Sequence, residues 1–190
     1  MTRTQAERSA ATQARLLDAT VECLADAGWA RTSTTEVVRR AGVSRGAQVH
    51  HFPTKDDLVV AAIEHLFARR TEEFRDAFAE LPPDERTAER AIDLLWATVQ
   101  GPTFRAWLEV VVAARTDPRL WAALEPVEHR FHEDVERTFL ELFPGAPTIA
   151  VRFAFTVLDG LAVEQLGCTR HDAGEMLGVL KYLATTIGAM

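Results

Sequence analysis

Cysteine is scarce in this 190-residue chain, which holds only Cys23 and Cys168, far apart in the sequence. Neither belongs to a C-x-x-C pair, so a zinc site made by cysteines is excluded and a disulfide framework is not expected. We interpret both as free thiols, with Cys23 packed in the first helix. Redox sensing is the alternative role for Cys168.

The sequence also lacks long apolar runs and several common enzyme motifs. Its first ten residues contain no apolar core of a signal peptide, and no apolar run is long enough to cross a bilayer. We therefore expect a cytoplasmic protein. H-E-x-x-H, a phosphate-binding glycine loop and a dinucleotide fingerprint are absent. An enzyme is accordingly the weaker interpretation, and we expect no catalytic residue and no cofactor.

Prolines and glycines divide the chain into segments with helical periodicity. Apolar residues recur at three- and four-residue spacing in the long segments, which predicts an all-α fold. The sequence Leu81-Pro82-Pro83-Asp84 is the clearest boundary, because proline lacks a backbone donor and restricts the residue before it. Beyond a helix pair around Gly42, we expect helices over about 8–27, 54–79, 87–101, 103–116, 119–143, 148–166 and from 172 onward.

The stretch Thr34–Lys55 has the pattern of a helix-turn-helix. A short apolar helix precedes Gly42, which can adopt the left-handed conformation of a tight turn at little cost. Ser33 lies three residues before Glu36, which is the spacing of a capping box at the start of the first helix. Ser44 can cap the second helix by the same chemistry.

The second helix of this pair carries small and hydrogen-bonding residues, which suits insertion into a DNA major groove. Gln48 can bond an adenine edge, Arg45 can bond guanine or phosphate, and Ala47 can contact a thymine methyl group. The same surface includes Gly46, His50 and His51. Lys55, in the first turn of the next helix, is placed to bind phosphate. The alternative is a short surface helix pair without a partner.

The formal charge of −7 argues superficially against nucleic acid, but the charge is unevenly distributed. Residues 1–60 contain eight Lys or Arg and seven Asp or Glu, whereas the remainder contains thirteen and twenty-one. Between Arg31 and Lys55 the only acidic residue is Glu36, against five basic residues. Such a local basic patch can meet phosphate, while the acidic remainder favours solubility.

The first third of the chain resembles the TetR family of transcriptional regulators. The resemblance rests on Leu16-Leu17, Ala27-Gly28-Trp29, Thr34-Thr35, Ala41-Gly42-Val43-Ser44, Gly46, His51-Phe52 and Lys55-Asp56-Asp57-Leu58. It implies an all-helical homodimer that binds a palindromic operator. The implied division is a helix-turn-helix DNA-binding domain at 8–70 and a helical ligand-binding and dimerisation domain at 71–190.

The resemblance also implies roles for individual residues. Contacts with the DNA backbone fall on Thr34, Thr35, Ser44, His50, His51 and Lys55, and base reading falls on Arg45, Gly46, Ala47 and Gln48. Two positions depart from the family pattern. Val49 replaces a residue that is usually aromatic, and Gln48 replaces one that is commonly apolar, which points to an altered phosphate contact and base preference.

The C-terminal part is rich in large rings, and the resemblance implies a ligand cavity there. The expected lining is Trp96, Phe104, Trp107, Val111, Trp121, Phe131 and Phe155. Glu109 and Asp159 lie among apolar neighbours and are candidates to orient a polar group of the ligand. The alternative is an ordinary helical core. His129 and His132 have a spacing that can hold a divalent metal, but a solvated polar face is the preferred interpretation.

The helix expected over 148–166 is apolar on more than one face, so it needs neighbours on opposite sides. With the final helix it can pair with a two-fold copy as a four-helix bundle, which places two reading helices about 34–36 Å apart on DNA. The sequence thus predicts a dimeric repressor, because an occupied operator blocks polymerase without further contacts, and a small, largely apolar effector. The alternative is a dimeric helical protein-interaction module without sequence-specific DNA binding.

Overall fold

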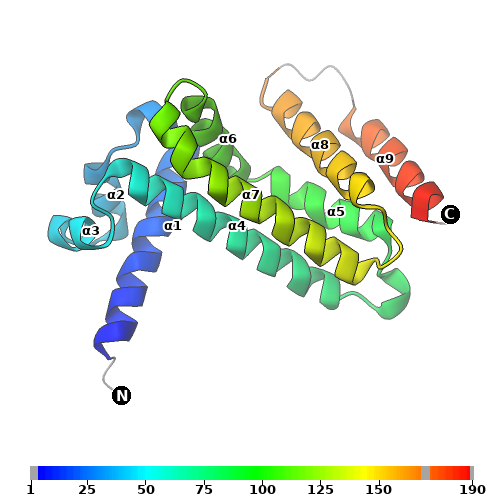
Figure 1. Cartoon of the computed structure of the whole chain (residues 1–190), viewed down its shortest axis with the longest axis horizontal. Helices are drawn as coiled ribbons and strands as arrows, with labels where there is room; N and C mark the ends of the chain where they lie inside the picture. Colours follow the sequence, from blue (N-terminus) through cyan, green and yellow to red (C-terminus); the bar gives the residue numbers. More distant parts are fainter. Residues whose placement is uncertain (1–3, 168–171, 189–190) are drawn as a thin grey trace. The chain divides into compact units, whose positions relative to one another are not determined.

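The computed structural model describes residues 4–167 and 172–188, so Cys168 lies outside the described part. Within these ranges the chain forms α-helices, one 3-10 turn and no strand, which confirms the all-α fold (Figure 1). The helices are α1 Gln5–Arg31, α2 Thr34–Ala41, α3 Arg45–His51, α4 Lys55–Ala79, α5 Ala88–Val99, α6 Pro102–Ala114, α7 Pro118–Leu142, α8 Thr148–Gln165 and α9 Ala173–Gly188. The 3-10 turn, η1, spans Pro83–Glu85 at the predicted boundary. None of these helices is long and apolar enough to cross a membrane.

The helices of the helix-turn-helix begin where the predicted caps lie. Ser33 and Ser44 each accept a hydrogen bond from the backbone N–H three residues further on, at 3.2 and 3.1 Å. Thr54 and Asp57 exchange two backbone-to-side-chain hydrogen bonds of 3.0 Å, a complete capping box at the start of α4. Gly42 ends α2 in the left-handed conformation, with φ 60° and ψ 39°. Local chemistry therefore sets the length of α2 and α3.

Helix α1 is longer than predicted at both ends. It begins at Gln5 because Thr4 and Glu7 form a capping box ahead of it. Gly28, the predicted stop, leaves helical geometry with φ 76° and ψ 172°, a conformation that is open almost only to glycine. An added Cβ at Gly28 would also lie 2.7 Å from Oε2 of Glu109 on α6. The backbone conformation therefore favours glycine there, whereas the contact with Glu109 involves only the end of a flexible side chain.

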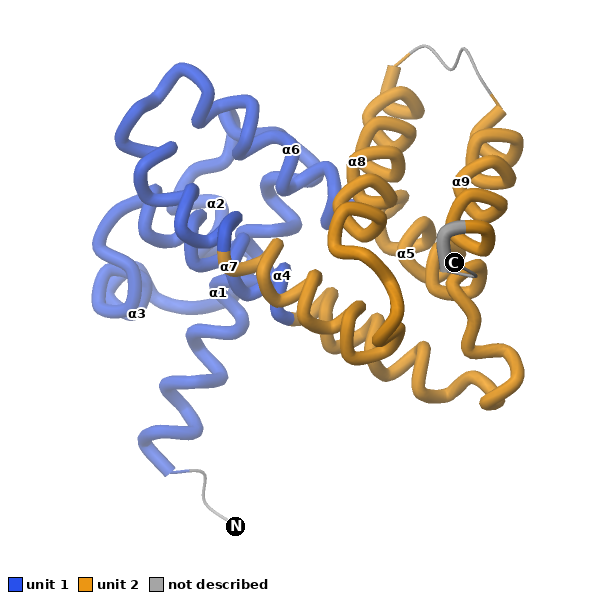
Figure 2. The backbone as a smooth tube through the Cα atoms, turned by 45° about the vertical axis from the view of Figure 1, so that its right-hand side comes forward, with its two compact units in different colours: residues 1–68, 102–129 blue, residues 69–101, 130–190 orange. Residues whose placement is uncertain are grey.

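The chain folds into two compact units, shown in blue and orange in Figure 2. The first contains residues 4–68 and 102–129, and the second contains residues 69–101, 130–167 and 172–188. The expected division at 70/71 lies close to the first boundary, but α6 and the start of α7 join the N-terminal unit. The reason is packing: α6 lies against α1, and its Phe104, Ala106 and Val110 are buried.

In the second unit, α5 packs against α8 and α9, which also contact each other. A cluster of four rings joins the second half of α4 to the end of α7. Its members are Phe74, Phe78, Phe139 and Phe143, with centroid distances of 5.3 to 6.1 Å. Helix α8 is not buried all round, as Ile149 and Phe153 are 70% and 46% exposed in the single chain.

Candidate nucleic-acid interface and ligand cavity

The turn between α2 and α3 is held by a residue that the sequence analysis missed. The Arg15 guanidinium on α1 donates through Nε to the Ala41 carbonyl at 2.9 Å, and through Nη2 to the carbonyls of Ala41 and Gly42 at 2.5 Å. These carbonyls end α2, where a cation also meets the negative end of the helix dipole. No local signal marks Arg15, because its partners are 26 and 27 residues away.

Most of the predicted DNA contacts are accessible at adjoining helix N-termini. The exposed positions are Thr35, Ser44, Arg45, Gly46 and His50, whereas Thr34, Ala47 and His51 are half-buried. Arg45 Nη1 donates to Thr34 Oγ1 at 2.5 Å, which joins the first turn of α3 to the first turn of α2. This bond holds the guanidinium in place through a neutral hydroxyl, so its positive charge stays available to an anion.

Gln48 is buried, and the predicted adenine contact by this residue is wrong. Its side chain is 1% exposed, and its Nε2 donates to the Phe52 carbonyl at 2.5 Å. Its Oε1 has no hydrogen-bond partner among the described residues. The amide faces the core because position 48 lies on the inner side of α3. Val49 is 46% exposed and occupies an outward position of this helix instead.

Lys55 is half-buried and has a partner within the protein. Its Nζ donates to the Trp29 carbonyl at 2.8 Å and lies 3.9 Å from the centre of the Trp29 ring. Burial lowers the pKa of this ammonium group. Lys55 therefore ties the start of α4 to the end of α1, and a phosphate contact would have to compete with these bonds.

The basic patch is partly neutralised by its own carboxylates. Glu36 accepts from Arg39 at 2.6 Å and from Arg40 at 3.1 Å, and these two bonds lower the pKa of Glu36 to about 2. Arg40 also donates to Asp26 at 2.6 Å. Two of the five predicted basic residues are thus paired with acids, which leaves Arg45 as the cation best placed on the α3 surface.

Residues 42–46 also match the letters of G-x-S-x-G, a pattern of serine hydrolases. In those enzymes the serine follows a strand, whereas Ser44 lies between two helices. Its hydroxyl accepts from the Ala47 amide and caps α3. The segment is a helix-turn-helix turn and not a nucleophile elbow.

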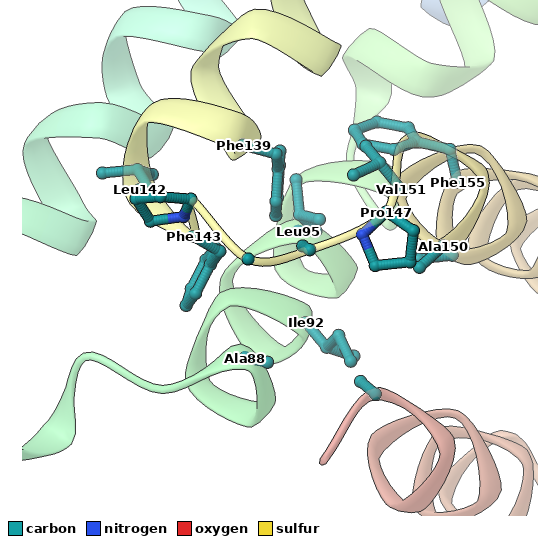
Figure 3. Close-up of a pocket in the computed structure, with 15 residues that line it drawn as sticks. Ala88, Ile92, Leu95, Phe139, Leu142, Phe143, Pro147, Ala150, Val151 and Phe155 are labelled. Atoms are coloured by element: carbon teal, nitrogen blue, oxygen red, sulfur yellow. The ribbon is translucent and has the colours of Figure 1, made fainter. Parts of the chain in front are cut away.

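A cavity of about 320 Å³ lies in the second unit, among α5, α7, α8, α9 and the loop after α7. Figure 3 shows Ile92, Leu95, Phe139 and Phe155 around it, together with Phe143 and Pro147 of the loop region. The lining is almost wholly apolar, and the size suits a small organic molecule. The expectation of a cavity in the C-terminal part agrees with this finding.

The cavity lining differs from the predicted set, of which only Phe155 takes part. Phe104 is 1% exposed and packs on Trp107, whose indole donates to Glu128 at 2.5 Å, so both belong to the first unit's own structure. Trp121 is 43% exposed on α7. Trp96 and Val111 are half-buried and line neither this cavity nor the smaller one described next. The size of a ring therefore does not show whether it lies in the core, on the surface or in the lining of the cavity.

A second cavity of about 30 Å³ lies beside the first, and its lining includes the polar side chains of Arg70, Thr71, Thr98 and Thr138. Phe131 and Phe155 line it, as does the guanidinium-bearing side chain of Arg70, which is 8% exposed. Asp159, the predicted polar residue of the ligand site, acts electrostatically on Arg70 but lines neither cavity. Burial raises the pKa of Asp159 to about 6, and Arg70 offsets part of that rise. Burial also lowers the pKa of Arg70.

Two further polar candidates have other surroundings than expected. Glu109 is exposed, and its Oε2 accepts from the Trp29 amide at 2.9 Å, so it fixes the end of α1 and does not line the large cavity. His129 and His132 are exposed on α7. Over residues 4–167 and 172–188, no group of three or more His, Cys, Asp or Glu side chains has an arrangement suited to a metal ion.

Replacing Gln48 with leucine should raise the free energy of unfolding by about 1 kcal/mol. The change removes a buried acceptor without a partner and adds apolar burial, which together outweigh the lost bond to Phe52. Chemical denaturation at fixed protein concentration measures the effect. His50→Leu, on the exposed side of the same helix, is the control and should change stability by less than about 0.5 kcal/mol. A loss of stability in Gln48→Leu would contradict the buried placement.

The raised pKa of Asp159 predicts a pH-dependent stability. The folded state holds this proton more tightly than the unfolded state, so stability from this group is present at low pH and is lost as pH rises through about 6. Relative to Asp159→Asn, which does not titrate, the wild type should lose about 2 kcal/mol between about pH 4.5 and 8. Urea denaturation of both proteins at matched concentration tests this. A constant difference between them across that range would contradict the raised pKa.

Sequence comparison relates this chain to proteins that are named for a helix-turn-helix. Residues 16–62 match the family model of bacterial regulatory proteins of the tetR family. The HTH-type transcriptional regulator Rv2912c of Mycobacterium tuberculosis is 34% identical over 170 residues, which cover 86% of this chain and 87% of that protein. The HTH-type transcriptional regulator CymR of Pseudomonas putida is 37% identical over 138 residues, which cover 73% and 68%.

A solved structure supports the same assignment over the whole fold. The multidrug binding protein EbrR, complexed with ethidium, aligns with a TM-score of 0.68 and 26% identity, and the alignment covers 91% of this chain and 98% of that chain. The curated relatives are regulators and not enzymes. This chain therefore belongs to the TetR family of DNA-binding transcriptional regulators.

Proposed function

We propose that the protein is a dimeric repressor that binds a palindromic operator and is released from it by a small, largely apolar ligand. The observation that carries the DNA part is the exposed first turn of α3, where Arg45 is fixed by Thr34 beside the Ser44 cap. The apolar cavity of about 320 Å³ supports the ligand part.

In this proposal, base reading falls on the exposed positions of α3. Arg45 bonds guanine, and Val49 takes the place first given to Gln48, with its methyl groups against a thymine methyl. Gly46 and Ala47 allow the helix to approach the base edges. Thr34, Thr35, Ser44, His50 and His51 contact the DNA backbone, whereas Lys55 contributes mainly by holding α4 against Trp29.

The exposed apolar residues of α8 and α9 support a homodimer through these two helices. In the single chain the exposed set is Ile149, Phe153, Val163, Leu166, Met176, Val179 and Tyr182. A monomer rarely exposes so many large apolar side chains on neighbouring helices. A second copy would cover them as a four-helix bundle, and the two-fold symmetry would match the palindrome.

The name of EbrR states that this related protein binds several drugs, and its structure holds ethidium. That likeness and the apolar lining of the cavity support a small organic effector for this chain. Repression is the simplest outcome, because a bound operator excludes polymerase without any further contact.

Two packed rings connect the cavity to helix α4. Phe139 lines the cavity and lies 5.3 Å from Phe74 of α4, measured between ring centres. Helix α4 is continuous from Lys55 to Ala79, and Lys55 is bonded to Trp29. A ligand that displaces Phe139 would tilt α4 and change the spacing of the two α3 helices. Equal α3 spacing in the ligand-bound and operator-bound dimers would contradict this route.

Selection of bound duplexes from a random DNA library tests the function. The expected result is a palindrome with two half-sites whose centres lie one helical turn apart. Affinity for it should fall steeply between about 50 and 200 mM salt, since Lys and Arg contacts release counterions. Recovery of no motif would overturn sequence-specific binding and favour a dimeric protein-interaction module.

The same selected duplex tests the dimer. Phe153→Glu places a charge among the exposed apolar residues of α8 and should give a monomer that binds the palindrome no more tightly than a single half-site. Val112→Glu, at a 57% exposed position on α6, is the control and should remain dimeric with wild-type affinity. Sedimentation gives the oligomeric state. A dimeric Phe153→Glu protein would show that another surface forms the interface.

A further inference from the structure

Arg70 is the most deeply buried charged residue of the second unit among the described residues. It lies on α4, is 8% exposed and lines the smaller cavity together with Thr71, Thr98 and Thr138. A buried guanidinium is costly unless its charge and its five donors are satisfied. A burial of this kind needs a structural or a functional reason.

The described residues of the protein supply few hydrogen-bond acceptors and no direct ion pair for the Arg70 guanidinium. Within the described ranges its hydrogen bonding consists of one long bond, from Nη2 to Thr98 Oγ1 at 3.3 Å. Asp159 and Glu73 act on it electrostatically, but neither forms a direct ion pair with it. By contrast, the neighbouring Arg75 donates to Thr138 at 2.7 Å and pairs with Glu141 at 3.5 Å. Arg70 thus retains donors for an additional acceptor.

The two cavities are adjacent. Leu95, Phe139 and Phe155 line both of them, and Figure 3 shows these three side chains on one side of the larger cavity. A molecule that fills the apolar space can therefore direct one end past these side chains to Arg70. The smaller cavity, at about 30 Å³, has room only for a small group, which favours a planar carboxylate over a bulkier, tetrahedral phosphate.

We propose that the effector is a small organic carboxylate whose apolar body fills the larger cavity and whose carboxylate accepts hydrogen bonds from the Arg70 guanidinium. This inference rests on the proposed ligand-released function and names its ligand class. A planar carboxylate matches the fork of an arginine and can accept two parallel bonds from it. A cationic ligand fits less well, because Arg70 lines the cavity whereas Asp159 does not.

Calorimetric titration of the protein at about pH 8 with matched probe pairs tests the proposal, as carboxylates are fully ionised there. The pairs are benzoate and benzamide, 2-naphthoate and 2-naphthamide, and decanoate and decanamide, with ethidium as the cationic probe. At least one carboxylate should bind about tenfold or more tightly than its amide, the range of a charge-assisted hydrogen bond. If no carboxylate outperforms its amide, or if ethidium alone binds, the proposal is overturned.

Variants locate the discriminating group. Arg70→Met keeps an unbranched apolar stem but removes the guanidinium and its charge, and it should reduce the preference for carboxylate over amide to within about threefold. Arg75→Met, on the same helix but 45% exposed at its side chain, is the matched control and should keep the wild-type preference. An unchanged preference in folded Arg70→Met would overturn the assignment.

A third variant covers the case in which Arg70→Met does not fold. Asp159→Asn removes an anion that competes for Arg70, so carboxylate affinity should rise severalfold while amide affinity stays the same. A fall in carboxylate affinity would overturn the proposal. Binding to the selected operator is measured separately. Release of the operator by an amide or by ethidium would overturn only the carboxylate inference. Carboxylate binding by a protein that binds no operator would overturn only the proposed function.

Discussion

Helix α3 has only seven residues, and a helix of that length is not stable in water by itself. The proposed reading surface therefore depends on bonds that other elements supply. Arg15 holds the α2–α3 turn from α1, and Lys55 ties α4 to Trp29. Gln48 faces the core from the inner side of α3, whereas Arg45 and Val49 are exposed. The inner side of this short helix thus packs on the protein, and its outer side carries the proposed DNA contacts.

The second unit shows the opposite distribution, with charge inside and apolar surface outside. Arg70 is buried and lines the smaller cavity with Phe131 and Phe155, and Asp159 is half-buried, whereas α8 and α9 expose large apolar side chains. A buried charge without a partner and an exposed apolar surface are both unfavourable in an isolated chain. A ligand of opposite charge and a protein partner, respectively, would remove these costs. A second copy accounts for the outer surface in our proposal, and an anionic ligand accounts for the inner charge. Binding partners would then complete this unit's stability as well as its function.

Much of the fold could be predicted because its signals are local. The caps at Ser33, Ser44 and Thr54 involve residues three positions apart, and Gly42 takes the left-handed turn expected of it. Proline positions gave the boundaries between later helices. The ligand residues were predicted poorly, because large rings serve equally well as core and as cavity lining. Trp107 and Phe155 are both large rings in apolar helical segments, yet they belong to different units.

The sequence by itself determined the helical fold, the helix-turn-helix and the polar, small-residue character of α3, because hydrogen bonds and periodicity within a few residues encode them. Only the tertiary structure decided which side of α3 faces outward, since one step around a helix exchanges Gln48 for Val49. It also decided that Arg15 caps the turn and that Arg70 lies beside an apolar cavity. Such contacts join residues tens of positions apart, and no pattern within one helix specifies them.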